Sequence, residues 1–171
     1  MTGVSVTVSD MEVQRALAAL ARLGRDPAPA LKALGPLLVA STRNRIVAEQ
    51  APDGAAWPRL HPAYAAAKRG PGMLRERAMR GGLFGSLTSQ QDGDTLRIGT
   101  NKRYAAVHQF GAVIRPQTAP ALVFPLGGRT VRAKRVTIPA RPFLGISAAD
   151  RDTIAEVIAD FARRATRRGA R

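Results

Sequence analysis

The sequence predicts an α+β fold in which a small antiparallel sheet packs against helices and carries a long projecting β-hairpin arm. Residues 31–46 and 154–161 place apolar side chains at helical spacing. Leu96 and Ile98 alternate with polar residues directly after an Asp-Gly turn, which is a strong hairpin signal. A second hairpin is predicted where Gly127-Gly128 separates two runs that contain valine and other strand-forming residues.

The N-terminal third of the chain is predicted to be mostly helical. After a short valine-rich strand over residues 4–8, a capping box begins a helix over residues 10–23, and Gly24 ends it. A second helix is predicted from Pro27 to about residue 50. Pro36 removes a backbone donor inside this helix, so we expect a kink or a restart there.

Between the second helix and the first hairpin, the sequence predicts turns and short elements. Trp57, the only tryptophan, follows a Pro-Asp-Gly turn, and we interpret it as a core side chain that closes the end of the helix. Residues 62–68 are predicted to form one or two helical turns. Residues 83–90 are predicted to be a strand that pairs with residues 95–99.

Residues 96–111 are predicted to hold a strand, a tight turn and a short helix that all face one core. Tyr104, Val107 and His108 lie at i, i+3 and i+4, and Gly111 follows where a helix C-cap favours positive φ. We therefore assign these aromatic and histidine side chains to the structural core: Trp57, Tyr104, His108, Phe110 and Phe143.

The C-terminal third is predicted to contain a basic arm, an extended edge segment and a final helix. Residues 115–137 form the arm, and their prolines and positive charge make burial within the chain unfavourable, so we expect the arm to reach a neighbouring subunit. Residues 138–143 carry two prolines and are predicted to be extended. A helix follows from Asp150, and residues 162–171 form an arginine-rich tail.

The charge of the chain points to polyanions or to acidic proteins as partners. The formal net charge is +15, and residues 95–149 contain no acidic side chain. DNA, if bound, is expected to be contacted at its phosphates without sequence preference. The chain has no cysteine, which excludes disulfides and thiolate metal sites. No apolar run approaches the ~18 residues of a membrane span, so no membrane contact is expected.

The sequence offers no catalytic set. The two histidines, His61 and His108, are too few for a zinc site, and Ser86 has no Asp and His arranged near it in the sequence. Asp92 and Asp94 could bind Mg²⁺, but loop aspartates more often only shape a turn. We therefore expect no enzymatic activity, no cofactor and no metal site.

Four short motifs in order resemble one known family. They are "APDGAAWPRL" at 51–60, "GGLFGSLT" at 81–88, "IGTNKRYAAVHQFG" at 98–111 and "IPARPFLGIS" at 138–147. Together they resemble the phage virion morphogenesis family, whose members are also called tail completion proteins. The resemblance covers roughly residues 30 to 160.

The resemblance implies a single tail-completion-type domain over residues 1–171. It implies a structural virion protein that acts in tail completion and head-tail joining and is assembled in the host cytoplasm. The protein is expected to form a ring around the DNA channel, and the ring is expected to be a hexamer. Its expected partners are copies of itself, neck or connector proteins, tail-tube proteins and duplex DNA.

Two sets of side chains are the expected contact sites. The interface between subunits or with partner proteins is assigned to Arg115, Val123, Phe124, Arg129, Arg132, Lys134, Arg135 and Arg141. Contact with DNA or an acidic partner is assigned to Arg163, Arg164, Arg167, Arg168 and Arg171.

Two other functions remain open on the sequence. A monomeric or dimeric, non-specific DNA-binding phage accessory protein would explain the charge without a ring. A phage-encoded nuclease or peptidoglycan hydrolase would require Asp92, Asp94 or His108 for its activity.

Overall fold

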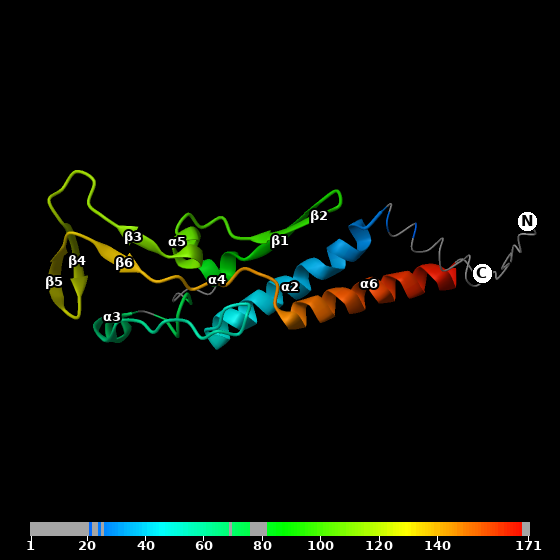
Figure 1. Ribbon diagram of the computed structural model, residues 1–171, viewed down its shortest axis with the longest axis horizontal. Helices are drawn as coiled ribbons and strands as arrows, with labels where there is room; N and C mark the ends of the chain where they lie inside the picture. Colours follow the sequence, from blue (N-terminus) through cyan, green and yellow to red (C-terminus); the bar gives the residue numbers. More distant parts are fainter. Residues whose placement is uncertain (1–20, 22–23, 25, 69, 76–81, 169–171) are drawn as a thin grey trace, which may run out of the picture.

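The computed structural model describes residues 21, 24, 26–68, 70–75 and 82–168, with the backbone alone for residues 165–168. The predicted strand at 4–8 and most of the predicted helix at 10–23 lie outside the described residues. The described chain is an elongated α+β structure with helices and antiparallel strands (Figure 1). The predicted fold class is therefore confirmed.

The described elements run in the following order along the chain. They are α2 (Ala28–Ala48), α3 (Pro62–Ala67), α4 (Leu83–Ser86), β1 (Thr88–Asp92), β2 (Thr95–Gly99), α5 (Ala105–Phe110), β3 (Ala112–Ile114), β4 (Leu122–Leu126), β5 (Arg129–Ala133), β6 (Val136–Ile138) and α6 (Ala148–Arg168). The strands form three separate two-stranded sheets, β1-β2, β3-β6 and β4-β5, instead of the one small sheet that was predicted.

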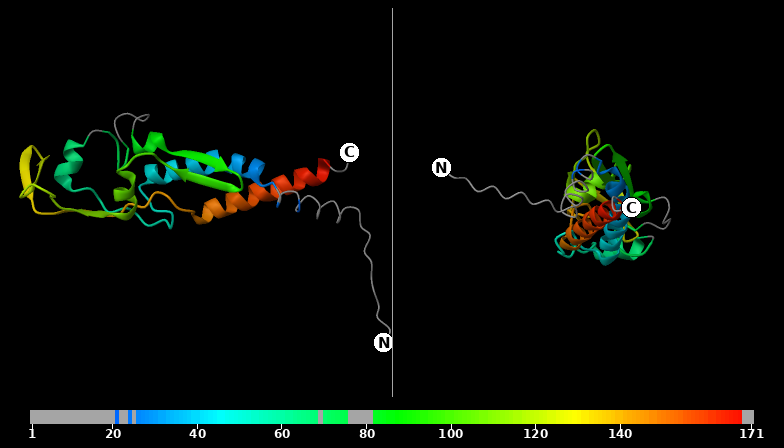
Figure 2. Two further views of the ribbon diagram at one scale, coloured as in Figure 1. Left: turned by 90° about the horizontal axis from the view of Figure 1, so that it is seen from above. Right: turned by 90° about the vertical axis from the view of Figure 1, so that its right-hand side faces the viewer.

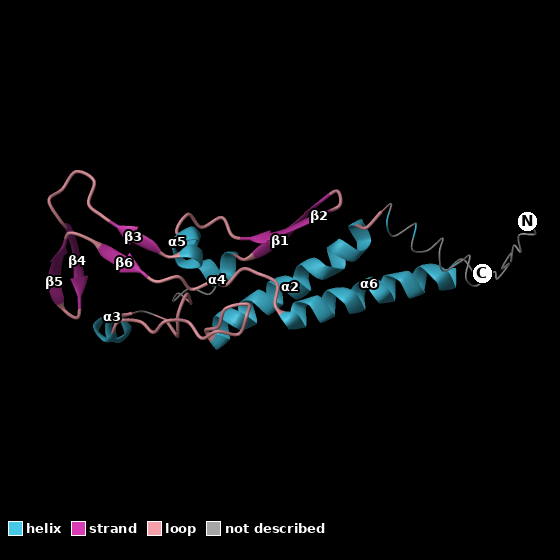
Figure 3. Cartoon of the chain, viewed as in Figure 1, coloured by secondary structure: helices cyan, strands magenta, loops and turns pink. Residues whose placement is uncertain are grey.

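Different elements occupy the two ends of the molecule. At one end, α2 packs along α6, and the β1-β2 hairpin lies against α2 (Figures 1 and 2). At the other end, the β4-β5 hairpin lies beside α3, while the β3-β6 pair connects it to the centre (Figure 3). The two ends therefore present different surfaces to a neighbouring molecule.

Helix α2 continues through Pro36 without the predicted restart. The helix approaches the β1-β2 hairpin closely at Gly35. A Cβ atom at this position would come within 2.6 Å of the Ser89 hydroxyl oxygen. The helix ends at Glu49, which adopts a left-handed conformation with φ of 57°. The amide of Trp57 then donates to the Glu49 carbonyl over 2.9 Å, so the tryptophan follows the helix end directly.

The prediction of a strand from residue 83 is wrong at its beginning. Leu83–Ser86 forms the short helix α4, and the strand β1 begins only at Thr88. Leu83 and Leu87 are both buried and are four residues apart, which is a helical spacing. The Ser86 hydroxyl donates back to the Leu83 carbonyl over 3.0 Å, which fits this turn of helix.

Residues 112–138 form a hairpin that is interrupted in the middle. β3 pairs with β6, and β4 pairs with β5 around the predicted Gly127-Gly128 turn. Residues 115–121 lie between the two ladders and belong to neither. The structure therefore does not bear out one continuous projecting arm over residues 115–137, because the β4-β5 part packs against α3.

The core lies where α2 meets the loop after it, α4 and the segment before α6. Ile46, Leu83 and Phe143 are the largest fully buried side chains, and Trp57 is 5% exposed. The assignment of Phe110 to this core is wrong, since its side chain is 79% exposed. It lies about 140° around the six-residue helix α5 from the buried Ala105, at 3.6 residues per turn.

Tyr104 and His108 are at the margin of the core. Tyr104 is 38% exposed and His108 is half-buried. Their rings meet edge to face with centroids 6.0 Å apart. Ala105 and Gln109, one residue further along, occupy the inward side of α5 that was predicted for Tyr104 and His108.

Candidate partner-binding surfaces

Several motif residues of the sequence, among them Trp57, Gln109 and Arg141, meet in a buried junction. The extended segment 139–147 runs from β6 to α6 through this junction. The Trp57 indole donates to the Pro142 carbonyl over 2.9 Å. The Gln109 side-chain oxygen accepts from the amides of Phe143 and Leu144, each over 3.0 Å, and its NH₂ group donates to the Leu144 carbonyl.

Arg141 belongs to this junction, and its assignment to a partner interface is wrong. Its side chain is 5% exposed, and its guanidinium donates to the Pro58 carbonyl over 3.0 Å and to the Arg59 carbonyl over 3.4 Å. Its amide donates to the His108 carbonyl over 2.7 Å. Burial lowers the pKa of Arg141, while the charge of Glu49 acts in the opposite direction.

A second buried group joins α6 to α2. Arg45 and Asp150 form an ion pair of 2.6 Å, with side chains 11% and 3% exposed. Asp150 accepts from the Ser147 amide over 2.8 Å, and the Asp150 amide donates to the Ser147 hydroxyl over 3.1 Å, so the two residues form a capping box. Burial raises the pKa of Asp150, but hydrogen bonds from Ser41 and Ser147 and the Arg45 charge outweigh it, so the pKa is lowered overall.

The side chains considered for catalysis lie apart and have local structural roles. His61 caps α3 by accepting from the Ala63 amide over 3.3 Å. Asp92 forms an exposed 3.5 Å pair with Arg97 beside the β1-β2 turn. Ser86 shares a 2.6 Å hydrogen bond with Thr100. Among the described residues, no three histidine or acidic side chains are grouped as metal ligands would be.

A cavity of about 610 Å³ lies between the β4-β5 hairpin, α3 and β6. Phe124 and Leu126 of β4 line it, as do Tyr64 of α3, Met73 and Ile138. The alternating burial along β4 turns Leu122, Phe124 and Leu126 inward and leaves Val123 59% exposed. Of the two apolar residues assigned to the partner interface, Val123 therefore faces solvent, whereas Phe124 faces this cavity.

The basic side chains of residues 115–135 remain at the surface. All of them are exposed, and none forms an ion pair with an acidic residue in the described part of the chain; they are Arg115, Arg129, Arg132, Lys134 and Arg135. These charges are therefore accessible to a partner, and an acidic partner would offset the hydration that they lose on contact. The segments that carry these residues, from the end of β3 to the start of β6, lie at one end of the molecule (Figure 1).

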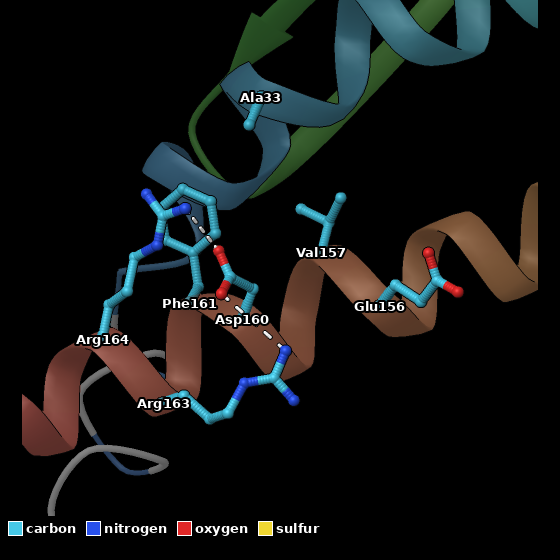
Figure 4. Close-up of a pocket in the computed structure, with 7 residues that line it drawn as sticks. All are labelled: Ala33, Glu156, Val157, Asp160, Phe161, Arg163 and Arg164. Carbon is cyan, nitrogen blue, oxygen red and sulfur yellow. Dashed lines mark ion pairs between the residues drawn. The ribbon is translucent and has the colours of Figure 1, made fainter.

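The described arginines at the C-terminal end of α6 are partly neutralised within their own helix. Arg163 and Arg164 pair with Asp160 over 3.8 Å and 2.7 Å. These residues border a groove between α6 and the start of α2, together with Ala33 and Phe161 (Figure 4). The side chains of Arg167 and Arg168, and the whole of Arg171, lie outside the described residues.

The comparisons with known proteins identify the family. The phage virion morphogenesis family matches residues 8–161 of the chain. The chain belongs to this family. Its role therefore lies in phage virion morphogenesis, and the resemblance of the four sequence motifs is confirmed.

A relative from another organism agrees with the family assignment. The chain is 37% identical over 79 residues to "Mu-like prophage FluMu G protein 2" of Haemophilus influenzae. The match covers 46% of this chain and 46% of that protein, so the chain spans about half the length of the relative. No solved structure matches this chain. Across its described residues, no helix combines the length and the apolar character that a membrane crossing needs.

Proposed function

We propose that the protein is a structural, non-enzymatic virion protein of a tailed bacteriophage that acts in tail completion and head-tail joining. The observation that carries this proposal is the family match over residues 8–161. Proteins that complete a tail act by presenting surfaces to their neighbours. The hydrogen bonds of motif residues in a structural junction, with the basic residues of 115–135 left at the surface, agree with such a role.

The protein acts as a ring, expected to be a hexamer, around the DNA channel at the neck or upper tail of the virion. The two ends of the subunit carry different elements. A contact in which one end of a subunit meets a different surface of the next copy is therefore heterologous. Heterologous contacts generate rings when the rotation between subunits closes. The partners are connector and tail-tube proteins, with duplex DNA passing through the ring.

Deletion of the gene from the phage genome that encodes it, followed by complementation, tests this function. Negative-stain microscopy of the deletion lysate should show heads and tails that accumulate without joining, and a plasmid copy should restore joined particles. Mass photometry of the purified protein and of neck complexes should show a species at six times the 18.2 kDa mass of one chain. Normal, infectious particles in the deletion lysate would refute the proposal.

A non-specific DNA-binding accessory protein is the second candidate. The exposed basic side chains without ion pairs at the β4-β5 end favour it. This function predicts tight binding to duplex DNA that weakens steeply with salt, together with monomers or dimers instead of a ring. A salt titration of DNA binding, measured beside the mass photometry, separates the two functions.

A further inference from the structure

The β4-β5 hairpin has one blocked and one open backbone edge. Gly127 and Gly128 form its turn with φ of 58° and 76°, and Leu126 opposite Arg129 closes the ladder. The next pair is Pro125 opposite Thr130. Proline has no amide hydrogen to donate across the ladder, so the Pro125 nitrogen lies on the outer edge of β4.

The alternation of an antiparallel ladder then fixes the outer edge of β5. Residues of one non-hydrogen-bonded pair both direct their backbone groups away from the partner strand. Thr130 lies in the same pair as Pro125, and Arg132 follows two residues later in the next such pair. The amides and carbonyls of Thr130 and Arg132 therefore face outward on β5, whereas Pro125 obstructs the corresponding edge of β4.

The location of β5 leaves this edge accessible. β4 packs against α3, while β5 forms the outer end of the molecule (Figures 1 and 2). Thr130 and Arg132 are both exposed. A third strand on β5 would pair with the backbone groups that face outward on this edge.

The charge around the edge selects the chemistry of that third strand. Arg129 and Arg132 belong to β5, and Lys134 and Arg135 follow it directly. No acidic residue occurs between Thr95 and Ala149 to neutralise them locally. A strand with acidic side chains therefore gains both backbone hydrogen bonds and opposite-charge pairs across the ladder.

We propose that the open edge of β5 binds an extended acidic segment of a neighbouring virion protein, which adds to β4-β5 as a third strand; this inference rests on the proposed function. A second copy of this chain is a poorer occupant. Of the strands described here, only β1 contains an acidic residue, Asp92, and the chain carries a net charge of +15. DNA would contact the arginine side chains without pairing with the backbone edge. Binding of DNA alone is therefore one outcome of the test, and it counts against the proposal.

The test compares three ligands on the full-length protein by fluorescence anisotropy. They are a synthetic peptide of alternating glutamate and valine, a matched peptide of alternating lysine and valine, and a short DNA duplex. Thr130→Pro removes an outward amide and places a ring on the open edge, as Pro125 does on β4. It should weaken binding of the glutamate peptide by about tenfold or more, and Thr130→Ala, which keeps the amide, should leave it unchanged.

Charge exchange provides an independent variant. Arg132→Glu keeps the backbone edge and should transfer the preference from the glutamate peptide to the lysine peptide. Thermal melting and amide exchange of β4-β5 show whether each variant retains its fold. If Thr130→Pro disrupts the hairpin, the peptide preference of Arg132→Glu decides whether the inference holds. An Arg132→Glu variant that still prefers the glutamate peptide to the lysine peptide overturns it.

Three results overturn the inference. They are equal affinity of Thr130→Pro and wild type for the glutamate peptide, equal affinity of the wild type for both peptides, and binding of the DNA duplex alone. Complementation of the gene deletion separates this inference from the proposed function. Full rescue by Thr130→Pro refutes the docking edge alone, whereas failure of the deletion to disturb head-tail joining refutes the function itself.

Discussion

Removal of the Asp150 carboxylate should destabilise the protein far more than removal of an exposed carboxylate on the same helix. Asp150→Ala leaves the Arg45 guanidinium, which is 11% exposed, without its 2.6 Å ion-pair partner, and it also removes the carboxylate that accepts from the Ser147 amide at the start of α6. Breaking a buried pair by removing one partner costs about 3–5 kcal/mol in the free energy of unfolding. We expect a value near the lower limit, because the guanidinium also donates to Ser41, Thr42 and the Gly145 carbonyl.

Asp160→Ala is the matched control. Asp160 pairs with Arg164 over 2.7 Å, but the two side chains are 39% and 71% exposed. The two ion pairs have nearly the same distance and differ mainly in burial. Because exposed pairs contribute only about 0.2–1 kcal/mol, Asp160→Ala should cost less than Asp150→Ala. Urea unfolding followed by the fluorescence of Trp57, the only tryptophan, measures both. Equal losses of stability in the two variants would contradict the assignment of the Arg45-Asp150 pair as a buried connection between helices.

The same variant tests the pH dependence. The pKa of Asp150 is lowered in the folded protein from its ordinary value of 3.8. The folded state therefore binds this proton less well than the unfolded state, and stability rises with pH across that range. The contribution of Asp150 should be complete above the ordinary value and should be lost as the pH falls through the lowered folded value. Asp150→Ala should reduce the slope of stability against pH in acid, and a slope equal to that of the wild type would contradict the lowered pKa of Asp150.

Three further substitutions test the packing of the fold. Gly35→Ala should destabilise the protein by about 1–3 kcal/mol in urea unfolding, because its Cβ would lie 2.6 Å from the Ser89 hydroxyl oxygen, and Ser89→Gly should rescue it. Trp57→Phe should cost about 1–3 kcal/mol by thermal unfolding, since it leaves the Pro142 carbonyl without its indole donor, and no loss would argue against that bond. Phe110→Ser should change the unfolding free energy of the monomer by about 0.5 kcal/mol or less, since the ring is 79% exposed; a core-sized loss would restore the sequence-based assignment.

Local sequence patterns predicted the short-range structure well. The Asp-Gly and Gly-Gly turns and the helical turn over Ala105–Phe110 are all present, because turn chemistry and i, i+3, i+4 spacing act over only a few residues. The same patterns failed where two periods compete. Leu83 and Leu87 are four residues apart, which puts both on one face of either a helix or a strand, so their spacing could not decide between the two.

Long-range placement could not be read from the sequence. Arg141 looked like one more exposed arginine of a basic segment, yet it is buried and donates to carbonyls more than eighty residues earlier in the chain. Its neighbours Pro139 and Pro142 were a usable signal, because they fix an extended segment whose backbone needs partners from elsewhere. Gln109 supplies such partners, and its position within a matched motif indicated that it had a structural role. Ser147 and Asp150 also form a capping box that the sequence spacing alone could have revealed.

The extended segment 139–147 has a mechanical consequence. It is the only stretch of chain between β6 and α6, and it runs along the long axis of the molecule (Figure 1). The hydrogen bonds from Trp57 and Gln109 attach to it from the side. A pull on the β4-β5 hairpin along this axis would therefore pass through segment 139–147 and act on these hydrogen bonds before it reached α6.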